Sequence, residues 1–520
     1  MRTTHRFVPL FVTLGQFLTL STGHPNHFAV MAGTTTAAAP PPALLSRPPV
    51  IVVGSGLAGL SAASQLVSHN VPVLLLERAP KPGGNSIKAS SGINGAPTRF
   101  QPVQNDNHIL FYNDTIKSAG GLVTAASFED RELRERLIVT LTKSSAAAVN
   151  WLADEHGIDL SRVTQLGGHS RPRTHRGAGQ KPPGVAIVST LLGLLEKNPL
   201  FTLRTGARVT KVLRKGDEVV GVEYAAGDSN ETETLQGPVV FASGGFAGDA
   251  HGLLAKYRPD LAGMPSTNEQ REGSQPLLED VGARVVDMDC VQIHPTGFVD
   301  PKDPTATVKI LAAEALRGDG AIMLLKDGSR FVNELDTRER VTEAIMRSAT
   351  RREEQCVRQW EVNLVLDEGA AEAASTHLGF YMWKGLIRKT TVSELGSAAQ
   401  QTLQEYADVV ARKKHDRHGR QHFGDWKLTE VKPESVIYVG QVTPVVHFTM
   451  GGVMINERSQ VLSPELRPIR GLWAAGEVTG GVHGRNRLGG SSLLECVVFG
   501  RIAGDQAASF YKQHYEGQPI

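Results

Sequence analysis

The sequence predicts an α/β protein in which a domain built on a parallel sheet is interrupted by a smaller α+β domain. A strand, a glycine turn, a helix and a second strand follow one another at 49–77. An irregular stretch rich in proline and charge occupies about 255–433, and glycine-rich strands return at 451–476. At 520 residues the chain is too long for a single compact core. We therefore expect residues 49–254 and 434–520 to form one domain, with 255–433 as an insertion.

The composition is that of an ordinary globular protein, with 40% hydrophobic and 21% charged residues. A formal net charge of +2 gives no reason to expect a nucleic-acid partner. The three cysteines, Cys290, Cys356 and Cys496, are widely spaced and form no Cys-x-x-Cys pair. This spacing excludes iron–sulfur clusters, c-type haem and structural zinc, so no metal site is expected.

The first 48 residues differ from the rest of the chain. No acidic residue precedes Glu77, and Arg2 and Arg6 stand before an apolar run at 7–20. That run is too short for a membrane span, which needs about 20 residues. We expect residues 1–48 to be a targeting or disordered segment, which addresses the protein to the mitochondrion or the endoplasmic reticulum. A cytoplasmic protein is expected instead if translation starts at Met31, and no span is expected in the body of the chain.

The first ordered elements carry a nucleotide-binding pattern. Val50–Val53 is an all-apolar, β-branched run, as expected of a strand buried on both faces. The turn Gly54–Gly59 follows, then a helical stretch, and then a second apolar run, which ends at Glu77. The glycines let a pyrophosphate approach the positive end of the helix. Glu77, 18 residues after Gly59, is placed to accept hydrogen bonds from a ribose. The pattern predicts dinucleotide binding.

Later segments continue the α/β pattern. The sequence predicts helices at 129–156 and 184–197, and strands at 201–204, 208–214, 219–225 and 238–242. A basic stretch at 412–422 is interpreted as a solvated loop. Further glycine-rich clusters lie at 83–84, 243–245, 476–477 and 489–492. Several remote loops that return to one ligand favour a long, buried cofactor such as FAD, although the spacing alone leaves NAD open.

Five motifs resemble the fumarate reductase/succinate dehydrogenase flavoprotein superfamily, and in particular its fungal fumarate reductases. They read Val-Gln-Ile-His-Pro-Thr-Gly at 291–297, Ala-Glu-Ala-Leu-Arg-Gly at 313–318, Asn-Glu-Leu-Asp-Thr-Arg at 333–338, Val-His-Phe-Thr-Met-Gly-Gly at 446–452, and Gly-Glu-Val-Thr-Gly-Gly-Val-His-Gly-Arg-Asn-Arg-Leu-Gly-Gly at 476–490. The resemblance extends from about Val50 to Phe510. It implies a Rossmann-like FAD-binding domain interrupted by a substrate-capping domain.

The resemblance also implies roles for individual residues. His294, His447 and Arg487 would hold the carboxylates of a small dicarboxylate substrate, and Arg338 would donate a proton to it. Glu314 and Arg317 would form the relay that returns a proton to Arg338. Together with the glycine motif, the resemblance places the FAD contacts at Gly54, Ser55, Gly56, Ala58, Gly59, Glu77, Arg78, Ser90, Ser91, Gly92, Val209, Gly244, Glu477, Ser492 and Leu493.

The activity implied is reduction of fumarate to succinate by reduced FAD. Departures from the family pattern are Ala313, where relatives often have a threonine that binds a substrate carboxylate, and Ser274, where relatives tend to have an aspartate. Asn85 stands where the membrane-bound relatives have a histidine that attaches FAD covalently, so non-covalent FAD is expected. Free reduced flavin or an unidentified donor protein is the expected electron source, and a monomer is expected.

Two other readings stay open. One is another enzyme of the same superfamily, above all L-aspartate oxidase, with urocanate or ketosteroid enzymes behind it; the segments at 446–452 and 479–481 favour fumarate reductase. The other is a flavin-binding subunit without turnover of its own.

Overall fold

The computed structural model describes residues 47–516, apart from 103–104, 122, 124–126, 180 and 228–230. They belong to one compact unit, Ser46–Ile520. The expected targeting segment, residues 1–48, lies outside the described residues except for its last two positions. Among the helices of the described part, none is both long and apolar enough for a membrane span.

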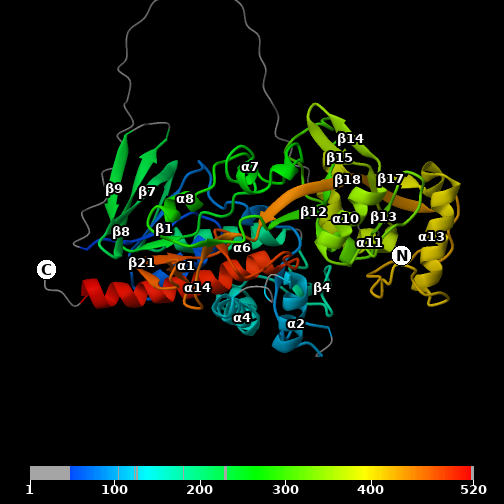
Figure 1. The fold of residues 1–520 in the computed structure, drawn as a ribbon. Coiled ribbons are helices and arrows are strands. Elements are labelled where there is room, and N and C mark those ends of the chain that lie inside the picture. Colours follow the sequence, from blue (N-terminus) through cyan, green and yellow to red (C-terminus); the bar gives the residue numbers. More distant parts are fainter. Residues whose placement is uncertain are drawn as a thin grey trace, which may run out of the picture. The chain divides into compact units, whose positions relative to one another are not determined.

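The larger part of this unit is built around a nine-stranded sheet (Figure 1). The strand order is β6-β2-β1-β10-β21-β8-β7, with β20 paired to β21 and β9 to β8. The strands are β1 (Val50–Val53), β2 (Val73–Glu77), β6 (Phe201–Thr205), β7 (Ala207–Lys215), β8 (Glu218–Ala226), β9 (Thr232–Gln236), β10 (Val239–Phe241), β20 (Gln460–Leu462) and β21 (Pro468–Ala474). β1, β2, β6, β10 and β21 are parallel. All four residues of β1 are buried, as expected of a central parallel strand covered on both faces.

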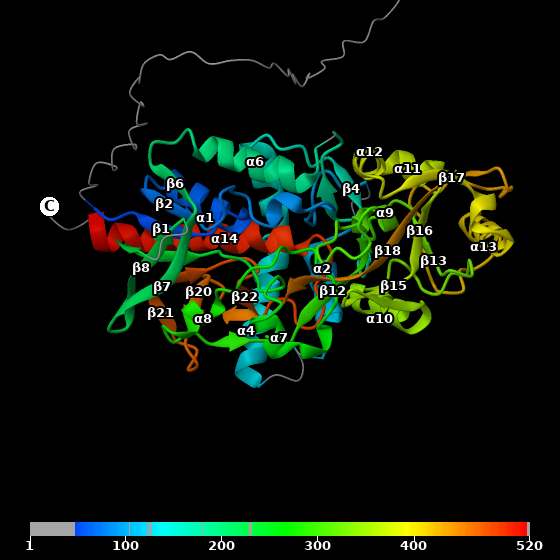
Figure 2. The same ribbon diagram turned by 90° about the horizontal axis from the view of Figure 1, so that it is seen from above.

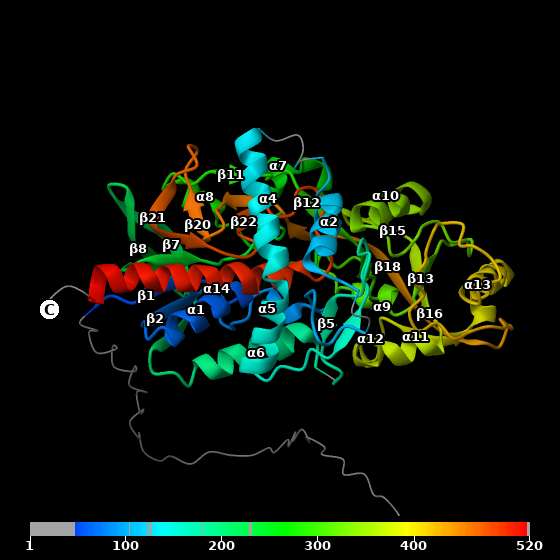
Figure 3. The same ribbon diagram turned by 90° about the horizontal axis from the view of Figure 1, so that it is seen from below.

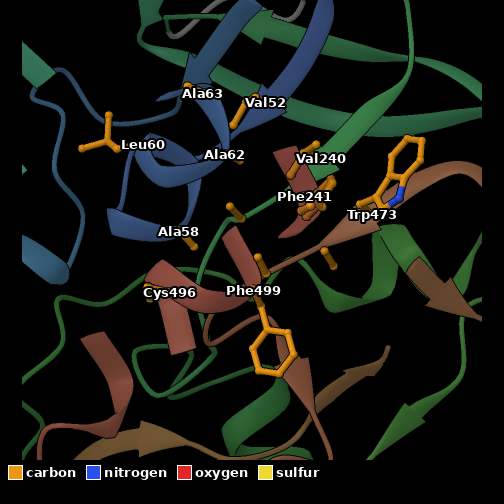
Figure 4. Close-up of a cluster of buried hydrophobic side chains, with 14 of the residues drawn as sticks. Val52, Ala58, Leu60, Ala62, Ala63, Val240, Phe241, Trp473, Cys496 and Phe499 are labelled. Atoms are coloured by element: carbon orange, nitrogen blue, oxygen red, sulfur yellow. The ribbon is translucent and has the colours of Figure 1, made fainter. Parts of the chain in front are cut away.

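The described residues of this part form the helices α1 (Leu57–Ser68), α2 (His108–Ala119), α4 (Phe128–Lys143), α5 (Ser145–Asn150), α6 (Pro183–Leu195), α7 (Leu253–Tyr257), α8 (Gln275–Glu279) and α14 (Ser491–Tyr511). The first and last of them lie side by side (Figures 1 and 2). Glycines allow this approach, because a Cβ at Gly500 would lie 2.6 Å from the carbonyl oxygen of Ala58, and one at Gly504 equally close to that of Ala62. Ala58, Ala62, Cys496 and Phe499 face the core beside the sheet (Figure 4). From below, α4 crosses α14 (Figure 3).

Two small sheets complete this part. One has the order β3-β5-β4 and the other β11-β19-β22. The strands are β3 (Ile93–Asn94), β4 (Arg162–Thr164), β5 (Thr174–Arg176), β11 (Val285–Val286), β19 (Gly452–Met454) and β22 (Thr479–Gly480). Short 3-10 or π segments are Ser86–Lys88, Trp151–Glu155, Pro259–Leu261, Val392–Leu395 and Lys512–Glu516.

A second, largely antiparallel sheet has the order β12-β18-β16-β13, with β17 paired to β18. Its strands are β12 (Val291–Phe298), β13 (Ile322–Leu324), β16 (Val362–Leu366), β17 (Arg388–Thr391) and β18 (Val436–Thr449), and the hairpin β14 (Arg351–Glu354) and β15 (Val357–Trp360) lies nearby. The helices around it are α9 (Glu314–Gly318), α10 (Arg338–Ser348), α11 (Glu368–Ala373), α12 (Ser375–Lys384) and α13 (Ser397–Val410). The predicted domain boundaries at 254 and 433 stay a prediction.

The predicted α/β fold and most of the predicted elements are confirmed. The helix expected at 129–156 is present as α4 and α5, and the expected strands correspond to β6, β7, β8 and β10. The interpretation of 412–422 as a solvated loop is wrong for two of its residues. Arg420 is 2% exposed and donates a 3.0 Å hydrogen bond to Glu334, while Asp416 accepts one from Arg330. Their charges are paired inside the protein, which the surrounding run of exposed basic residues does not reveal.

Candidate active site

A cavity of about 640 Å³ lies at the carboxyl ends of the parallel strands. Its walls come from regions far apart in the sequence, including the turn after β1, the segment after β2, the turn after β10 and the start of α14. The carboxyl end of an open parallel sheet is where such folds bind their ligands. The cavity also reaches residues of β18 and α10, so both large sheets contribute to it.

The glycine turn presents the start of α1 to this cavity. Gly56 makes no side-chain capping hydrogen bond, and the Leu57 N–H donates to the Ser86 hydroxyl at 3.0 Å, with all three residues on the cavity wall. Gly54 has φ +103°, and a Cβ on it would lie 2.4 Å from the carbonyl oxygen of Ala242. A Cβ on Gly59 would lie 1.9 Å from the carbonyl oxygen of Gly54. Only glycine fits at these two positions.

Glu77 is held at the end of β2 as the glycine motif requires. Its Oε2 accepts a 3.0 Å hydrogen bond from the Ser55 N–H, and a second bond from the Ser55 hydroxyl. Its Oε1 accepts from the Ala79 N–H at 2.8 Å. The carboxylate is buried and lines the cavity, so its remaining lone pairs are aimed at the place where a ribose would lie.

The structure brings together nearly all of the predicted FAD contacts. The predicted residues that line the cavity are Gly54, Ser55, Gly56, Ala58, Glu77, Arg78, Ser90, Ser91, Gly92, Val209, Gly244, Glu477, Ser492 and Leu493. Gly59 lies behind the turn instead of on the cavity wall. Sequence reasoning missed Arg271 and Asn268, which also line the cavity; they stand on irregular segments without a motif.

Glu477 is the one carboxylate on the far wall of the cavity. Its Oε1 accepts from the Thr449 N–H at 3.0 Å. Burial raises the pKa of Glu477 to about 7, although the Thr449 bond opposes this change. A half-buried carboxyl on the cavity wall, bonded here only by Thr449 at one of its oxygens among the described residues, fits a cofactor that offers hydroxyl donors, as the ribityl chain of FAD does.

Three of the four residues predicted to bind or protonate the substrate, His447, Arg487 and Arg338, line one end of the cavity, while His294 is buried against His447 and is not on the cavity wall. The rings of His294 and His447 lie edge to face with centroids 5.2 Å apart. Burial, and then the charge of Arg338, lowers the pKa of both imidazoles well below the usual value. His294 Nδ1 accepts from the Thr296 N–H at 3.2 Å, so its proton sits on Nε2. That Nε2 is buried without a partner among the described residues, and it is therefore a donor available to a ligand.

Two arginines share one acceptor beside these histidines. Gln292 Oε1 accepts from Arg338 Nη1 at 2.8 Å and from Arg487 Nη2 at 3.1 Å. Arg487 also stands over the Phe448 ring at 4.1 Å, and burial together with Arg338 lowers its pKa to about 9. Gln292 was missed from the sequence. It lies two residues before His294 in β12, and alternate residues of a strand share a face.

The predicted relay is assembled behind Arg338. Arg338 donates from Nε to Glu314 Oε2 at 2.7 Å, and its Nη2 lies 2.6 Å from the same oxygen. Arg317 Nη2 lies 3.8 Å from Glu314 Oε1. Burial opposes ionisation of Glu314, but Arg338 and Arg317 outweigh it and lower the pKa of the carboxyl to about 2. Neither Glu314 nor Arg317 lines the cavity, whereas Arg338, His447 and Arg487 do.

The chain matches the FAD binding domain family over residues 49–493. It belongs to that family. FAD is therefore its cofactor, and the cavity described above offers the start of α1, the ribose carboxylate and the glycine turns that FAD requires. The superfamily indicated by the sequence motifs is confirmed.

Relatives and solved structures agree with this assignment. The chain is 43% identical over 480 residues to "Fumarate reductase 1" of Saccharomyces cerevisiae, which covers 88% of this chain and 98% of that protein. It is 42% identical to "Fumarate reductase" of Schizosaccharomyces pombe, over 88% of this chain and 89% of that one. The open conformation of a flavocytochrome c3 fumarate reductase superposes with a TM-score of 0.67 at 32% identity, over 89% of this chain and 78% of that one.

Proposed function

We propose that this protein is an FAD-dependent fumarate reductase that converts fumarate to succinate. The observation that carries the proposal is the convergence of His447, Arg338 and Arg487 at one end of the FAD cavity, with His294 packed against His447. Its similarity to two fungal fumarate reductases, at 42–43% identity, supports it.

The site suits a doubly charged, planar substrate. Arg487 offers a guanidinium that can bind a carboxylate through two parallel hydrogen bonds. The Nε2–H of His294 has no other partner in the described chain and can serve as a further donor. Both histidines are neutral, so they orient the substrate through hydrogen bonds while the two arginines supply the positive charge.

Bound FAD, once reduced, supplies a hydride to one alkene carbon. Negative charge then develops on the neighbouring carbon and its carboxylate. Arg487 and Arg338 are aimed at this end of the cavity, and pre-positioned positive groups in a buried site are a major source of transition-state stabilisation.

Arg338 provides the proton for that carbon. Its Nε and Nη2 both face Glu314, and Nη1 donates one of its two hydrogens to Gln292. The second hydrogen of Nη1 is left for the substrate. An arginine has a pKa above about 12 and loses a proton only briefly. Glu314 is held as a carboxylate, so it is placed to relay a new proton from Arg317 to Arg338 once Arg338 has given its own to the substrate.

An anaerobic assay of the purified holoenzyme tests the proposal. Reduced FMN or FAD is supplied as the electron donor, and fumarate, other unsaturated dicarboxylates and L-aspartate with oxygen are offered in parallel. Succinate formed from fumarate at a rate well above that of the other acids is the expected result. Oxidation of aspartate without reduction of fumarate would replace the proposal by an aspartate oxidase, and no turnover with any acid would leave a non-catalytic flavoprotein.

A further inference from the structure

A short loop between β4 and β5 contacts both Glu314 and the turn that follows Arg487. Its glycine pair and histidine, Gly167, Gly168 and His169, come from the first third of the chain and belong to none of the five family motifs. The Gly167 N–H donates to Glu314 Oε1 at 2.8 Å. Two residues later, His169 Nε2 lies 3.0 Å from the carbonyl oxygen of Gly489, in the turn that follows Arg487.

The proton position on His169 follows from its neighbours. Arg173 Nη1, which can only donate, lies 3.1 Å from His169 Nδ1, so that nitrogen accepts and Nε2 carries the hydrogen. Arg173 is itself fixed by Asp106 and Asp114 at 2.5–2.9 Å. The ring therefore points a permanent N–H at Gly489, and a second proton would have to face Arg173.

The turn after Arg487 is held at successive backbone carbonyls. Gln292 Nε2 donates to the carbonyl of Arg487 at 2.7 Å, and the guanidinium of Arg487 donates to the carbonyl of Leu488 at 3.1 Å. The carbonyl of Gly489 receives two donors, Asn94 Nδ2 at 2.8 Å and His169 Nε2. Because Arg487 bonds its own turn, the orientation of these peptides sets the direction of its guanidinium.

The loop at 167–169 and the turn at 487–490 both pack closely against the carboxylate of Glu314. A Cβ on Gly167 would lie 2.8 Å from Glu314 Oε1, and one on Gly489 would lie 2.6 Å from Glu314 Oε2. The turn that carries Arg487 thus packs directly on the relay carboxylate, with the loop holding both from one side.

We infer that His169 is a positioning residue, which fixes the turn 487–490 so that Arg487 faces the substrate at a set distance from the Arg338–Glu314 pair. The inference rests on the proposed function, because Arg487 is taken to bind a substrate carboxylate. His169 touches neither substrate nor cofactor in this arrangement; it acts through Gly489.

The test compares His169→Leu, which fills the volume of the ring without a donor, with His169→Gln, whose amide nitrogen can replace Nε2–H. Neither change leaves a partner of His169 without a hydrogen bond. The Gly489 carbonyl still accepts from Asn94, and Arg173 still donates to Asp106 and Asp114. Malonate binding to the oxidised holoenzyme is followed by flavin absorbance, and steady-state kinetics with fumarate give KM and kcat. Loss of one hydrogen bond predicts a Kd for malonate and a KM raised about fivefold to tenfold in His169→Leu, with kcat changed less than about twofold.

His169→Gln is expected to keep the wild-type Kd within about twofold. The matched control is His175→Leu, which removes another buried histidine, from the strand β5 that follows the loop. Its ring bonds Thr98 and backbone carbonyls at 93 and 173 but not the turn 487–490. This control is expected to lower the melting temperature without changing the Kd.

A wild-type Kd in His169→Leu, or equal losses in the leucine and glutamine variants, would overturn the inference while fumarate reduction stands. A wild-type protein that binds no malonate would sink the proposed function, and this inference with it.

Discussion

Replacing Arg338 by leucine separates proton delivery from every other part of the reaction. The change removes three contacts of 2.6–2.8 Å, two to Glu314 and one to Gln292. Glu314 would then keep the Gly167 N–H and a single arginine at 3.8 Å. Leaving a buried carboxylate half paired costs about 3–5 kcal/mol, which a domain with about 5–15 kcal/mol of stability survives when FAD is bound.

The catalytic loss is larger than the loss of stability. A positioned general acid contributes about 10²–10⁴ in rate, and a positive group at the developing charge about 10²–10³. Since Arg338 supplies both, we expect kcat for fumarate to fall by at least about 10³. Malonate should still bind through Arg487 and the histidines. The assay is the anaerobic oxidation of reduced flavin by fumarate, with the malonate titration alongside. A variant that turns over within tenfold of the wild type would refute Arg338 as the donor.

Three further changes test the cofactor site and the Gln292 amide that holds the two substrate-binding arginines. Gly59→Ala places a Cβ 1.9 Å from the Gly54 carbonyl, so the purified variant should retain little FAD, whereas Gly193→Ala, where nothing lies within 4 Å, should retain it fully by absorbance. Glu477→Gln should raise the melting temperature of the deflavinated protein at about pH 8 but not at about pH 4. The folded-state pKa of Glu477 is raised to about 7, so the wild type loses stability as the pH rises from about 4.5 to about 7, by roughly 3 kcal/mol. Gln292→Leu should lower kcat/KM for fumarate about tenfold or more, because both arginines lose their shared acceptor.

Each of these three predictions can be contradicted by a specific result. Equal FAD content in the two glycine variants would mean that the turn can shift to accept a side chain. A melting-temperature difference for Glu477→Gln that is independent of pH would mean that this carboxyl ionises normally. A wild-type kcat/KM in Gln292→Leu would mean that the arginines hold their positions without the amide.

The parts that sequence predicted well are local. The strand, turn, helix and acid between Val50 and Glu77 form within one short segment, so their spacing alone specifies them. Ser90, Val209 and Glu477 were predicted to contact FAD, and the structure brings them to one cavity; their roles as FAD contacts stay a prediction.

The parts that sequence did not predict depend on contacts between distant segments. Gln292 acquires its place only when Arg338 and Arg487, 46 and 195 residues away, meet at its amide. His169 reaches Gly489 across 320 residues. In the sequence, Arg420 is one of several basic residues in a charged stretch. No neighbouring residue indicates that it pairs with Glu334, 86 positions earlier. A single sequence gives no distances of this kind.

The order of the parallel strands also constrains when the cofactor can enter. β1 pairs with β10, β10 pairs with β21, and the wall of the cavity ends with Cys496 on the helix that lies along α1. The glycine turn at 54–59 is thus synthesised long before the opposite wall at 490–496. Sheets closed by such distant partners form slowly. FAD therefore meets a finished pocket only after the chain has been synthesised as far as Cys496, and until then the nascent protein holds half a binding site.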